Sequence, residues 1–213
     1  ETSQEGLALD YATAWSYGRA ESWNLLIPDF MGGDSGRAFT RDGEMAKALK
    51  PYGLESFAEQ LPAYWGEQPY TAGPTYLGAA ALFLALLGLL LASGRNKWWI
   101  AAVSLLTLLL AWGHNFMGFT EFAFKYLPGY NKFRTVSMAL VVVEWTVPLL
   151  AALALMPLWR GEVPRRKLLR ALAWAGGITG GFCLLFAVAG SAIFDFGRTE
   201  AADFMSRQYY QMF

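Results

Sequence analysis

The amino-acid sequence predicts an all-α integral membrane protein with four transmembrane helices, preceded by an outward-facing loop segment that contains short helices. Hydrophobic residues make up 55% of the 213 residues and charged residues only 16%, whereas soluble domains carry about a quarter charged residues. Four apolar stretches in the last two thirds of the chain approach the roughly 20 residues that cross a bilayer as a helix. Charge is also segregated, with 11 acids and 5 bases in residues 1–75 but five bases and one acid in residues 160–170.

Residues 1–75 are predicted to form a folded extracytoplasmic loop segment, because they hold too many aromatic residues for a solvated linker. Asp42 can cap a short helix that runs to Lys50, and residues 54–61 predict a second short helix; a proline follows each of them. The glycines of residues 31–36 predict a loop. Since the sequence starts at Glu1 without a signal peptide and ends within an amphipathic pattern, we expect an internal segment of a longer protein.

The transmembrane region is expected over residues 76–194. The predicted spans are about residues 76–93, 98–116, 135–159 and 171–194. The second is short, and it reaches an adequate length only if the helix continues through His114 to Phe116. Residues 195–213 are predicted to begin a further extracytoplasmic segment.

The basic residues predict the orientation of these spans, because Lys and Arg in short loops favour the cytoplasmic side. The link after the first span carries Arg95 and Lys97, and the link after the third carries the five bases of residues 160–170. Both links are therefore expected inside, and residues 1–75 and the link 113–134 outside. Three bases in that outer link conflict mildly with the rule.

Two overlapping Gly-x-x-x-Gly pairs occur in residues 176–181 of the last span. Glycine lets two helix backbones approach closely in lipid. The expected partner is another span of the same protein, with a dimer face or a hinge as the alternatives.

Glu144 lies about ten residues into the third predicted span, at a depth of roughly 15 Å. A carboxylate there is costly unless it is paired, protonated or beside water. We expect an intramembrane polar site that faces the protein interior, with a structural hydrogen bond as the alternative to a functional role. Pro148, one turn later, removes a backbone donor and predicts a kink.

Lys132 and Arg134 stand beside aromatic residues where the chain enters the third span from outside. Two cations in this pattern suit a phosphate or pyrophosphate headgroup, and snorkelling to anionic lipid is the equal alternative. His114 and Asn115, at the outer end of the second span, are candidates for the same phosphate or lipid-carrier site.

Several other classes of site are excluded or disfavoured. The balanced charge gives no reason to expect nucleic acid, and there is no P-loop, dinucleotide-binding fingerprint or nucleophile elbow. One histidine and the single Cys183 make neither a disulfide framework nor a His/Cys metal site. A bound metal would need outer carboxylates such as Asp29, Asp34 or Glu67.

Three stretches carry a resemblance to a known family: residues 26–33 (LIPDFMGG), 64–74 (YWGEQPYTAGP) and 127–134 (LPGYNKFR). Their order and their placement outside the membrane resemble the YfhO-type bacterial integral membrane proteins. The resemblance covers most of the chain, and it implies a longer protein of the bacterial cytoplasmic membrane, with helices before and after this segment.

The YfhO-type family is similar to the C-type glycosyltransferases, which take a sugar from a polyprenyl-phosphate carrier on the outer face of the membrane. The resemblance implies a catalytic carboxylate in a first outer loop that precedes this segment, so no catalytic base is assigned here. Asp29, Asp34, Trp65 and Glu67 become candidates for the acceptor side of the outer loops. We expect no cofactor in this segment, and a divalent cation for the whole protein stays open.

Three hypotheses of different classes follow. The first is a glycosyltransferase-like protein that moves a sugar to an extracytoplasmic acceptor, with membrane lipid, a polyprenyl-phosphate sugar donor and further helices of the same protein as partners. The second is a transporter or flippase that uses Glu144, and the third is a non-catalytic scaffold subunit. An enzyme is expected to gather Lys132, Arg134 and His114 at one outer cleft, whereas a transporter is expected to pair Glu144 with a cation in a wet cavity.

Overall fold

The computed structural model describes residues 7–37, 39, 40 and 42–194 of the chain. Within these ranges the chain is helical with irregular connections and forms no β-strand; one isolated antiparallel bridge joins Gly32 and Tyr64. The prediction of an all-α protein is therefore confirmed for the described residues. The segment predicted to begin at residue 195 lies outside them.

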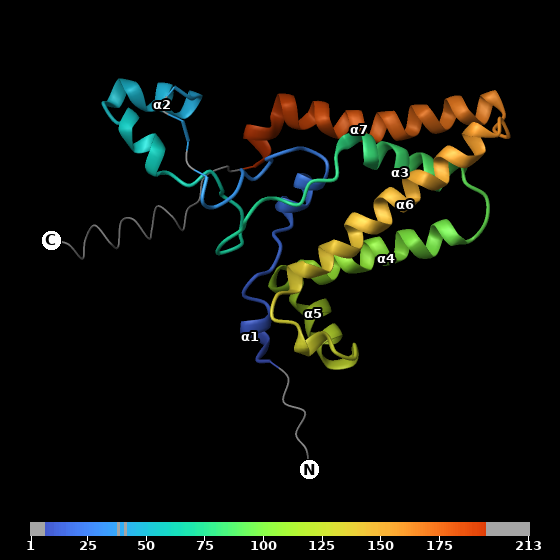
Figure 1. Ribbon diagram of the computed structural model, residues 1–213, viewed down its shortest axis with the longest axis horizontal. Coiled ribbons are helices and arrows are strands. Elements are labelled where there is room, and N and C mark those ends of the chain that lie inside the picture. The colour runs from blue at the N-terminus through green and yellow to red at the C-terminus, as the bar shows by residue number, and fades with distance from the viewer. Residues whose placement is uncertain (1–6, 38, 41, 195–213) are drawn as a thin grey trace, which may run out of the picture.

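Four long helices form the bundle: α3 (Ala79–Leu91), α4 (Asn96–Ala111), α6 (Leu140–Trp159) and α7 (Arg165–Ile193). They lie lengthwise in Figure 1, and α6 packs along both α3 and α4 while α7 packs on α3. The centre of the bundle is thus the pair α3 and α6, with α4 and α7 on its flanks.

The central pair packs closely because α3 carries a glycine where it meets α6. A Cβ atom on Gly88 would overlap the backbone carbonyl oxygen of Leu150. Around this approach the core consists of small and branched apolar side chains, which interdigitate well between helices. One buried cluster, which also includes Tyr17 and Leu25 of the N-terminal segment, is formed by Tyr17, Leu25, Ala85, Ile100, Ala111, Leu140, Val143, Val147 and Leu150.

Among the described residues, two helices are long and apolar enough to cross a membrane. One is α6 with the preceding 3₁₀ turn η6 (Val136–Ala139), together 24 residues, and the other is α7 over Arg165–Gly190. A third crossing exists if α4 and the bent helix that follows it count as one span. At 13 residues, α3 is apolar but shorter than a full crossing.

The second predicted span is not one continuous helix. It ends at Ala111, and Gly113 adopts a left-handed φ of 48°, which an L side chain rarely tolerates. The chain then turns by 112° through η4 (Gly113–Phe116) into α5 (Met117–Tyr126). The expectation that this helix runs through His114 to Phe116 is therefore wrong, because the chain turns at Gly113.

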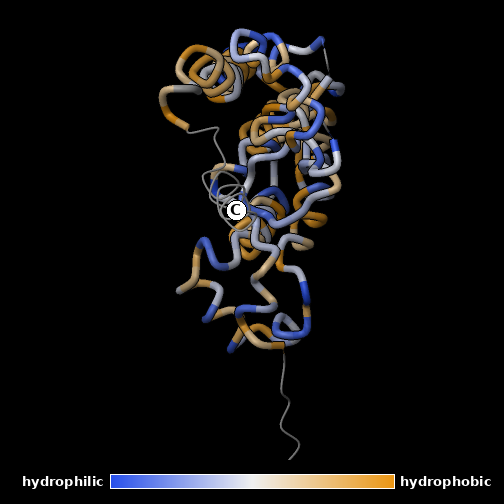
Figure 2. The backbone as a smooth tube through the Cα atoms, turned by 90° about the vertical axis from the view of Figure 1, so that its left-hand side faces the viewer, coloured by the Kyte–Doolittle hydropathy of each residue, from blue (hydrophilic) through white to orange (hydrophobic). Residues whose placement is uncertain are grey.

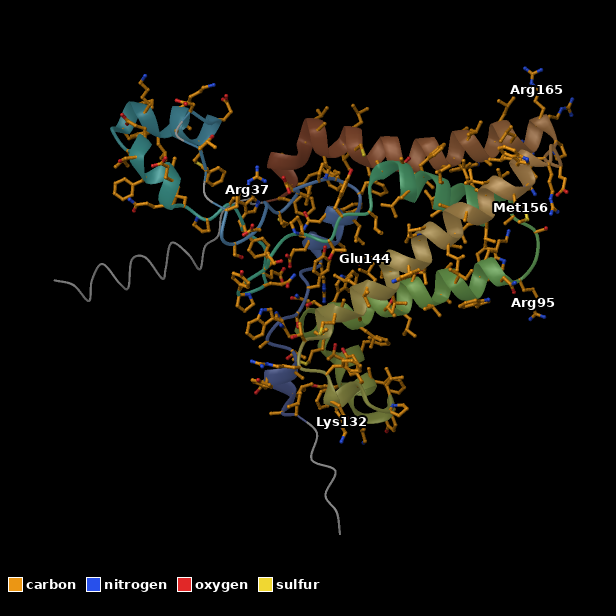
Figure 3. All side chains as sticks on the ribbon, in the orientation of Figure 1. Arg37, Arg95, Lys132, Glu144, Met156 and Arg165 are labelled. Atoms are coloured by element: carbon orange, nitrogen blue, oxygen red, sulfur yellow. The ribbon has the colours of Figure 1, made fainter. Side chains whose placement is uncertain are left out.

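The two basic links lie at the same end of the bundle, as Figure 3 shows for Arg95 and Arg165. Leu91 at the end of α3 packs in one cluster with Leu158 of α6 and Val163 of the link between α6 and α7. Lys97 also has a local role, because its Nζ donates hydrogen bonds to the backbone oxygens of Leu89 and Ala92 at 2.7 and 2.8 Å. A lysine in this position satisfies carbonyls left free at a helix C-terminus.

The N-terminal segment forms short helices at the opposite end of the bundle: α1 (Leu9–Ala12), η1 (Ala20–Leu25), α2 (Glu44–Leu49), η2 (Lys50–Tyr52) and η3 (Glu55–Gln60). Both predicted short helices are present, although the second is a 3₁₀ helix. Together, α2 and η3 pack on each other away from the bundle (Figure 1). Apolar residues dominate the long helices, and hydrophilic residues gather along the connecting segments (Figure 2).

Candidate functional site

An apolar cavity of about 370 Å³ lies between the four long helices. Almost all of its lining side chains are aliphatic or aromatic, and Ser22, Ser104 and Thr179 supply the few polar ones. Its size falls within the range of small-molecule sites, which are mostly apolar with few polar groups. Inside a membrane-spanning bundle, such a cavity suits a hydrocarbon chain.

The short helix η1 covers one end of this cavity and ties it to the N-terminal segment. Trp23 and Leu26 of this region line the cavity. The Ser22 hydroxyl accepts a hydrogen bond of 2.8 Å from the Trp112 indole nitrogen at the end of α4. Trp23 also packs against Phe182 and Phe186 of α7, with ring centroids 4.8 and 4.6 Å apart. A chain bound in the cavity would therefore meet the N-terminal segment at this end.

A buried carboxyl group lies directly beside this cover. Glu21 is only 2% exposed, and its carboxyl oxygens accept hydrogen bonds from the Gly18 backbone N–H at 2.6 Å and from the Tyr64 hydroxyl. The Tyr17 hydroxyl donates to the Glu21 backbone oxygen at 2.7 Å. Glu21 was not predicted from the sequence, since an acid among aromatic residues in a loop carries no recognisable pattern.

Burial raises the pKa of the Glu21 carboxyl above its ordinary value of 4.5, and the negative charge of Glu67 raises it further. The hydrogen bonds from Tyr64 and Gly18 act in the opposite direction, because they favour the charged form. Burial also raises the pKa of the Tyr17 hydroxyl. The N-terminal segment thus holds a carboxyl group that gains a proton more readily than an exposed acid.

His114 and Asn115 hold the N-terminal segment against the corner between α4 and α5. The His114 backbone N–H donates to the Ser16 hydroxyl at 2.9 Å, and its ring Nδ1 lies 3.1 Å from the Thr13 oxygen. The Asn115 amide donates to the Tyr17 oxygen at 3.1 Å. Both residues therefore make structural contacts with residues 13–17.

Lys132 and Arg134 are exposed at the end of the molecule that carries the N-terminal segment (Figure 3 labels Lys132). The Arg134 guanidinium lies 5.4 Å from the centre of the Tyr11 ring, a cation–π distance. Arg134 and His114 thus contact the same segment at different points. The apolar cavity is lined by none of Lys132, Arg134 and His114, and a common outer cleft for them stays a prediction.

Glu144 is exposed on the surface of α6, in the half nearer the N-terminal segment (Figure 3). Among the described residues no hydrogen bond or ion pair involves its side chain. It does not face the interior of the described bundle, because that face of α6 is formed by residues such as Val143, Thr146 and Val147. A partner beyond the described residues stays a prediction.

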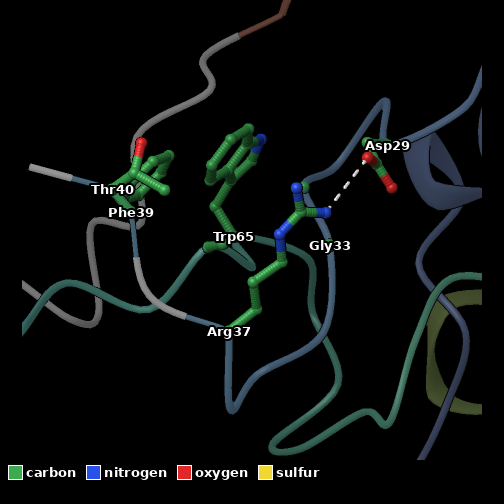
Figure 4. A pocket seen from close by; sticks show the side chains of 8 residues that line it. Asp29, Gly33, Arg37, Phe39, Thr40 and Trp65 are labelled. Carbon is green, nitrogen blue, oxygen red and sulfur yellow. Dashed lines mark ion pairs between the residues drawn. The ribbon is translucent and has the colours of Figure 1, made fainter. Parts of the chain in front are cut away.

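Two of the acceptor-side candidates line a second pocket in the N-terminal segment (Figure 4). Asp29 and Trp65 meet there with Arg37, whose guanidinium Nη1 lies 3.6 Å from Asp29 Oδ2. The other two candidates lie elsewhere. Asp34 accepts a hydrogen bond from the Gly36 backbone within a turn, and Glu67 lies on the surface near Glu21.

No group of three or more His, Cys, Asp or Glu side chains that could hold a metal ion occurs among the described residues. No family model matches the chain, and searches of the curated proteins and of the solved structures find no match either. The assignment of function therefore depends on the residues and contacts of this chain.

Proposed function

We propose that this chain is part of a bacterial inner-membrane, glycosyltransferase-like protein that moves a sugar from a polyprenyl-phosphate carrier to an acceptor outside the membrane. The observation that supports this proposal best is the apolar cavity between α3, α4, α6 and α7. It offers an uncharged environment for a hydrocarbon chain, and it ends at an N-terminal segment rich in polar and aromatic groups.

The proposal includes four crossings and an outward N-terminal segment. The two basic links, with Arg95 and Lys97 after α3 and five bases in residues 160–170 after α6, share one end and hold seven of the ten basic residues of 76–194, which favours the cytoplasm for that end. The 13 residues of α3 are short for a crossing, which a locally thinner bilayer accommodates at a modest cost.

In this arrangement Lys132 and Arg134 stand at the outer surface, where a carrier phosphate would lie. The Arg134 guanidinium lies 5.4 Å from the centre of the Tyr11 ring, and an arginine fork can make a bidentate phosphate contact. His114 and Asn115 support the site indirectly, because they hold residues 13–17 in place.

Photoaffinity labelling tests the proposal. The probe is a polyprenyl phosphate with a diazirine on its chain, added to the protein in native membranes, and the labelled peptides are mapped by mass spectrometry. We expect labels in α3, α4, α6 and α7 that unlabelled polyprenyl phosphate competes away. Ala101→Phe fills the cavity and is expected to reduce labelling, whereas Ala102→Phe on the exposed side of the same helix is the matched control.

Equal labelling of the two variants, or labels confined to the outer surface of α7, contradicts the proposal. An assay of sugar release from the carrier then separates the enzyme from a protein that only binds lipid.

The scaffold hypothesis has one observation in its favour. Large apolar side chains are exposed along α6 and α7, among them Trp145, Trp159 and Trp174, and such faces also suit neighbouring helices. The transporter hypothesis has less support, because Glu144 does not line the cavity between the helices.

A further inference from the structure

The pocket beside Trp65 is separate from the apolar cavity and lies wholly in the N-terminal segment. Its volume is about 250 Å³, slightly below the roughly 300 Å³ at which drug-sized sites begin. A ligand of the size of one sugar ring is therefore the largest that it holds in full. It is lined by Asp29, Gly32, Gly33, Arg37, Phe39, Thr40, Ala63 and Trp65.

Backbone hydrogen bonds between two loops fix the walls of this pocket. The Gly33 N–H donates to the Ala63 oxygen at 2.7 Å, and the Ala63 N–H donates to the Arg37 oxygen at 2.8 Å. The Trp65 N–H donates to the Met31 oxygen at 3.1 Å. A site held by such contacts is preorganised, so a ligand pays less ordering cost on binding.

Two aromatic rings form one side of the pocket. The rings of Phe39 and Trp65 are nearly parallel, with an interplanar angle of 7° and centroids 6.3 Å apart. Their faces suit the flat C–H surface of a sugar ring, because aromatic faces carry partial negative charge and the C–H groups are weakly positive. The Trp65 indole N–H is also buried without a hydrogen-bond partner among the described residues, and a buried donor of this kind favours an acceptor within reach.

The other side of the pocket carries one positive and one negative group. Arg37 and Asp29 are 65% and 56% exposed and lie 3.6 Å apart, so both can exchange this weak contact for a ligand. Figure 4 shows the guanidinium between Trp65 and Asp29. Since the two charges balance, the pocket has little preference for a phosphate or a carboxylate. It offers donors from Arg37 and acceptors from Asp29, which is what neighbouring hydroxyl groups require.

The backbone at Asp29 is a further sign of a specialised site. Its φ of 52° is the only positive value of a residue other than glycine in the described part of the chain. Aspartate tolerates this conformation better than most residues, and such outliers occur often at ligand-binding positions.

We infer that this pocket binds the uncharged, hydroxylated ring of a saccharide, with Phe39 and Trp65 against the ring face and Arg37 and Asp29 on its hydroxyl groups. This inference rests on the proposed function and specifies its sugar-binding side. The binding event is reversible and involves no covalent step.

Ligand-observed saturation-transfer NMR tests the inference with the protein in nanodiscs. The probes are methyl glycosides of common hexoses and N-acetylhexosamines. At least one is expected to bind saturably, with a Kd that rises about tenfold or more in Trp65→Ala, a loss of about 1.4 kcal/mol. Trp65→Phe keeps an aromatic face and is expected to lose less. The control is Phe57→Ala, which removes an exposed ring of η3 outside the pocket.

A second set of variants tests the contribution of Asp29 and Arg37. Asp29→Asn and Arg37→Gln are each expected to weaken glycoside binding while leaving the fold intact, because both side chains are exposed. Inorganic phosphate serves as the competing probe. The inference is overturned if no glycoside binds saturably, if binding is the same in Trp65→Ala and Phe57→Ala, or if phosphate alone binds and Arg37→Gln abolishes it.

The two proposals fail separately. Loss of glycoside binding with intact polyprenyl-phosphate labelling refutes only the saccharide pocket. Intact glycoside binding without competed labelling of the long helices refutes the lipid-carrier function and leaves a saccharide-binding membrane protein.

Discussion

At the scale of single residues, Glu21 shows how closely the N-terminal segment is packed. Its carboxyl group is enclosed by Tyr64 and by two glycines: a Cβ atom on Gly18 would lie 2.8 Å from Glu21 Oε2, and one on Gly66 would overlap Oε1. The carboxyl is therefore part of the packing of two loops distant in sequence. Its protonation then affects how firmly those loops hold together.

The raised pKa of Glu21 predicts a pH dependence. Since the folded segment binds the proton more tightly than the unfolded chain, the stability from this group is complete below about pH 4.5 and falls as the pH rises through the folded pKa. Glu21→Gln is expected to remove this fall. Hydrogen exchange of the Gly18 and Gln68 amides between pH 4 and 8 (about the range in which buried carboxyls titrate), corrected for the intrinsic rate, measures it. The prediction is contradicted if the amide protection changes with pH to the same extent in the original protein and in Glu21→Gln.

Glu144 predicts a partner outside the described residues, because a carboxylate exposed to hydrocarbon costs about 2.5–3.5 kcal/mol or more. If that partner is structural, Glu144→Gln is expected to be tolerated and Glu144→Leu to destabilise the protein. Thermal unfolding of the protein in native membranes measures this, with Val141→Leu on the same exposed face as the control. If Glu144→Gln folds normally but has no activity, Glu144 takes part in proton or ion coupling. Equal stability and activity of all three variants rules out both roles.

Arg134 predicts a loss of carrier binding when it is replaced. Arg134→Ala is expected to weaken photolabelling by the polyprenyl-phosphate probe more than Arg95→Ala at the opposite end, because a phosphate contact of an arginine fork is charge-assisted. Lys97 is a poor control, since it caps α3. Arg134→Lys retains the charge without the fork and is expected to bind at an intermediate level. Equal labelling of Arg134→Ala and Arg95→Ala would mean that Arg134 contacts ordinary anionic lipid by snorkelling and does not bind the carrier phosphate.

At the scale of the elements, the close helix contact involves a glycine that the sequence analysis did not single out. The Gly-x-x-x-Gly pairs lie on α7, where a Cβ atom on Gly177, Gly180 or Gly181 would have no neighbour within 4 Å among the described residues. The remaining glycine, Gly176, faces α3, where its Cβ atom would lie 3.8 Å from the Phe83 ring, so these pairs make no close backbone contact in the described bundle. Close packing occurs instead at Gly88 of α3, against the backbone of α6.

The two glycines provide a matched pair of variants. Gly180→Ala is expected to be neutral or to stabilise α7 by up to about 1 kcal/mol, because alanine is the better helix former. Gly88→Ala is expected to destabilise the bundle by about 1–3 kcal/mol, because the new methyl group overlaps the Leu150 carbonyl. Thermal unfolding in the same detergent compares the variants. Equal effects would mean that α3 and α6 do not pack as described.

At the scale of the whole molecule, the arrangement of the links predicts the topology. Single cysteines in a Cys183→Ser background, treated with an impermeant maleimide from outside, test it. Asp42→Cys in the N-terminal segment is expected to react, and Arg165→Cys at the start of α7 is expected to react only after permeabilisation. Reaction at position 165 without reaction at position 42 reverses the orientation.

Apolar runs and turn residues were sufficient to predict the class of fold and the approximate places of the long helices. Residues 135–159 coincide with η6 and α6, since a long apolar stretch forms a helix in lipid to satisfy its backbone hydrogen bonds, and the single acid Glu144 does not prevent this. The short helices at 42–50 and 54–61 were also located, because proline and glycine act through local sterics. The break at Gly113 was missed, since a glycine near the end of an apolar run has no distinct pattern before its φ is known.

Which segments are helical and apolar could be read from the sequence, because these properties depend on neighbours within a few residues. The exposure of Glu144, the burial of Glu21, and the contact of Gly88 rather than the α7 glycines with a backbone became known only from the folded structure. It also brought Arg37 and Asp29 to the same pocket as Trp65. These outcomes depend on contacts between residues far apart in the chain, and the side chain that a residue meets is set by how helices and loops pack, which no local pattern specifies.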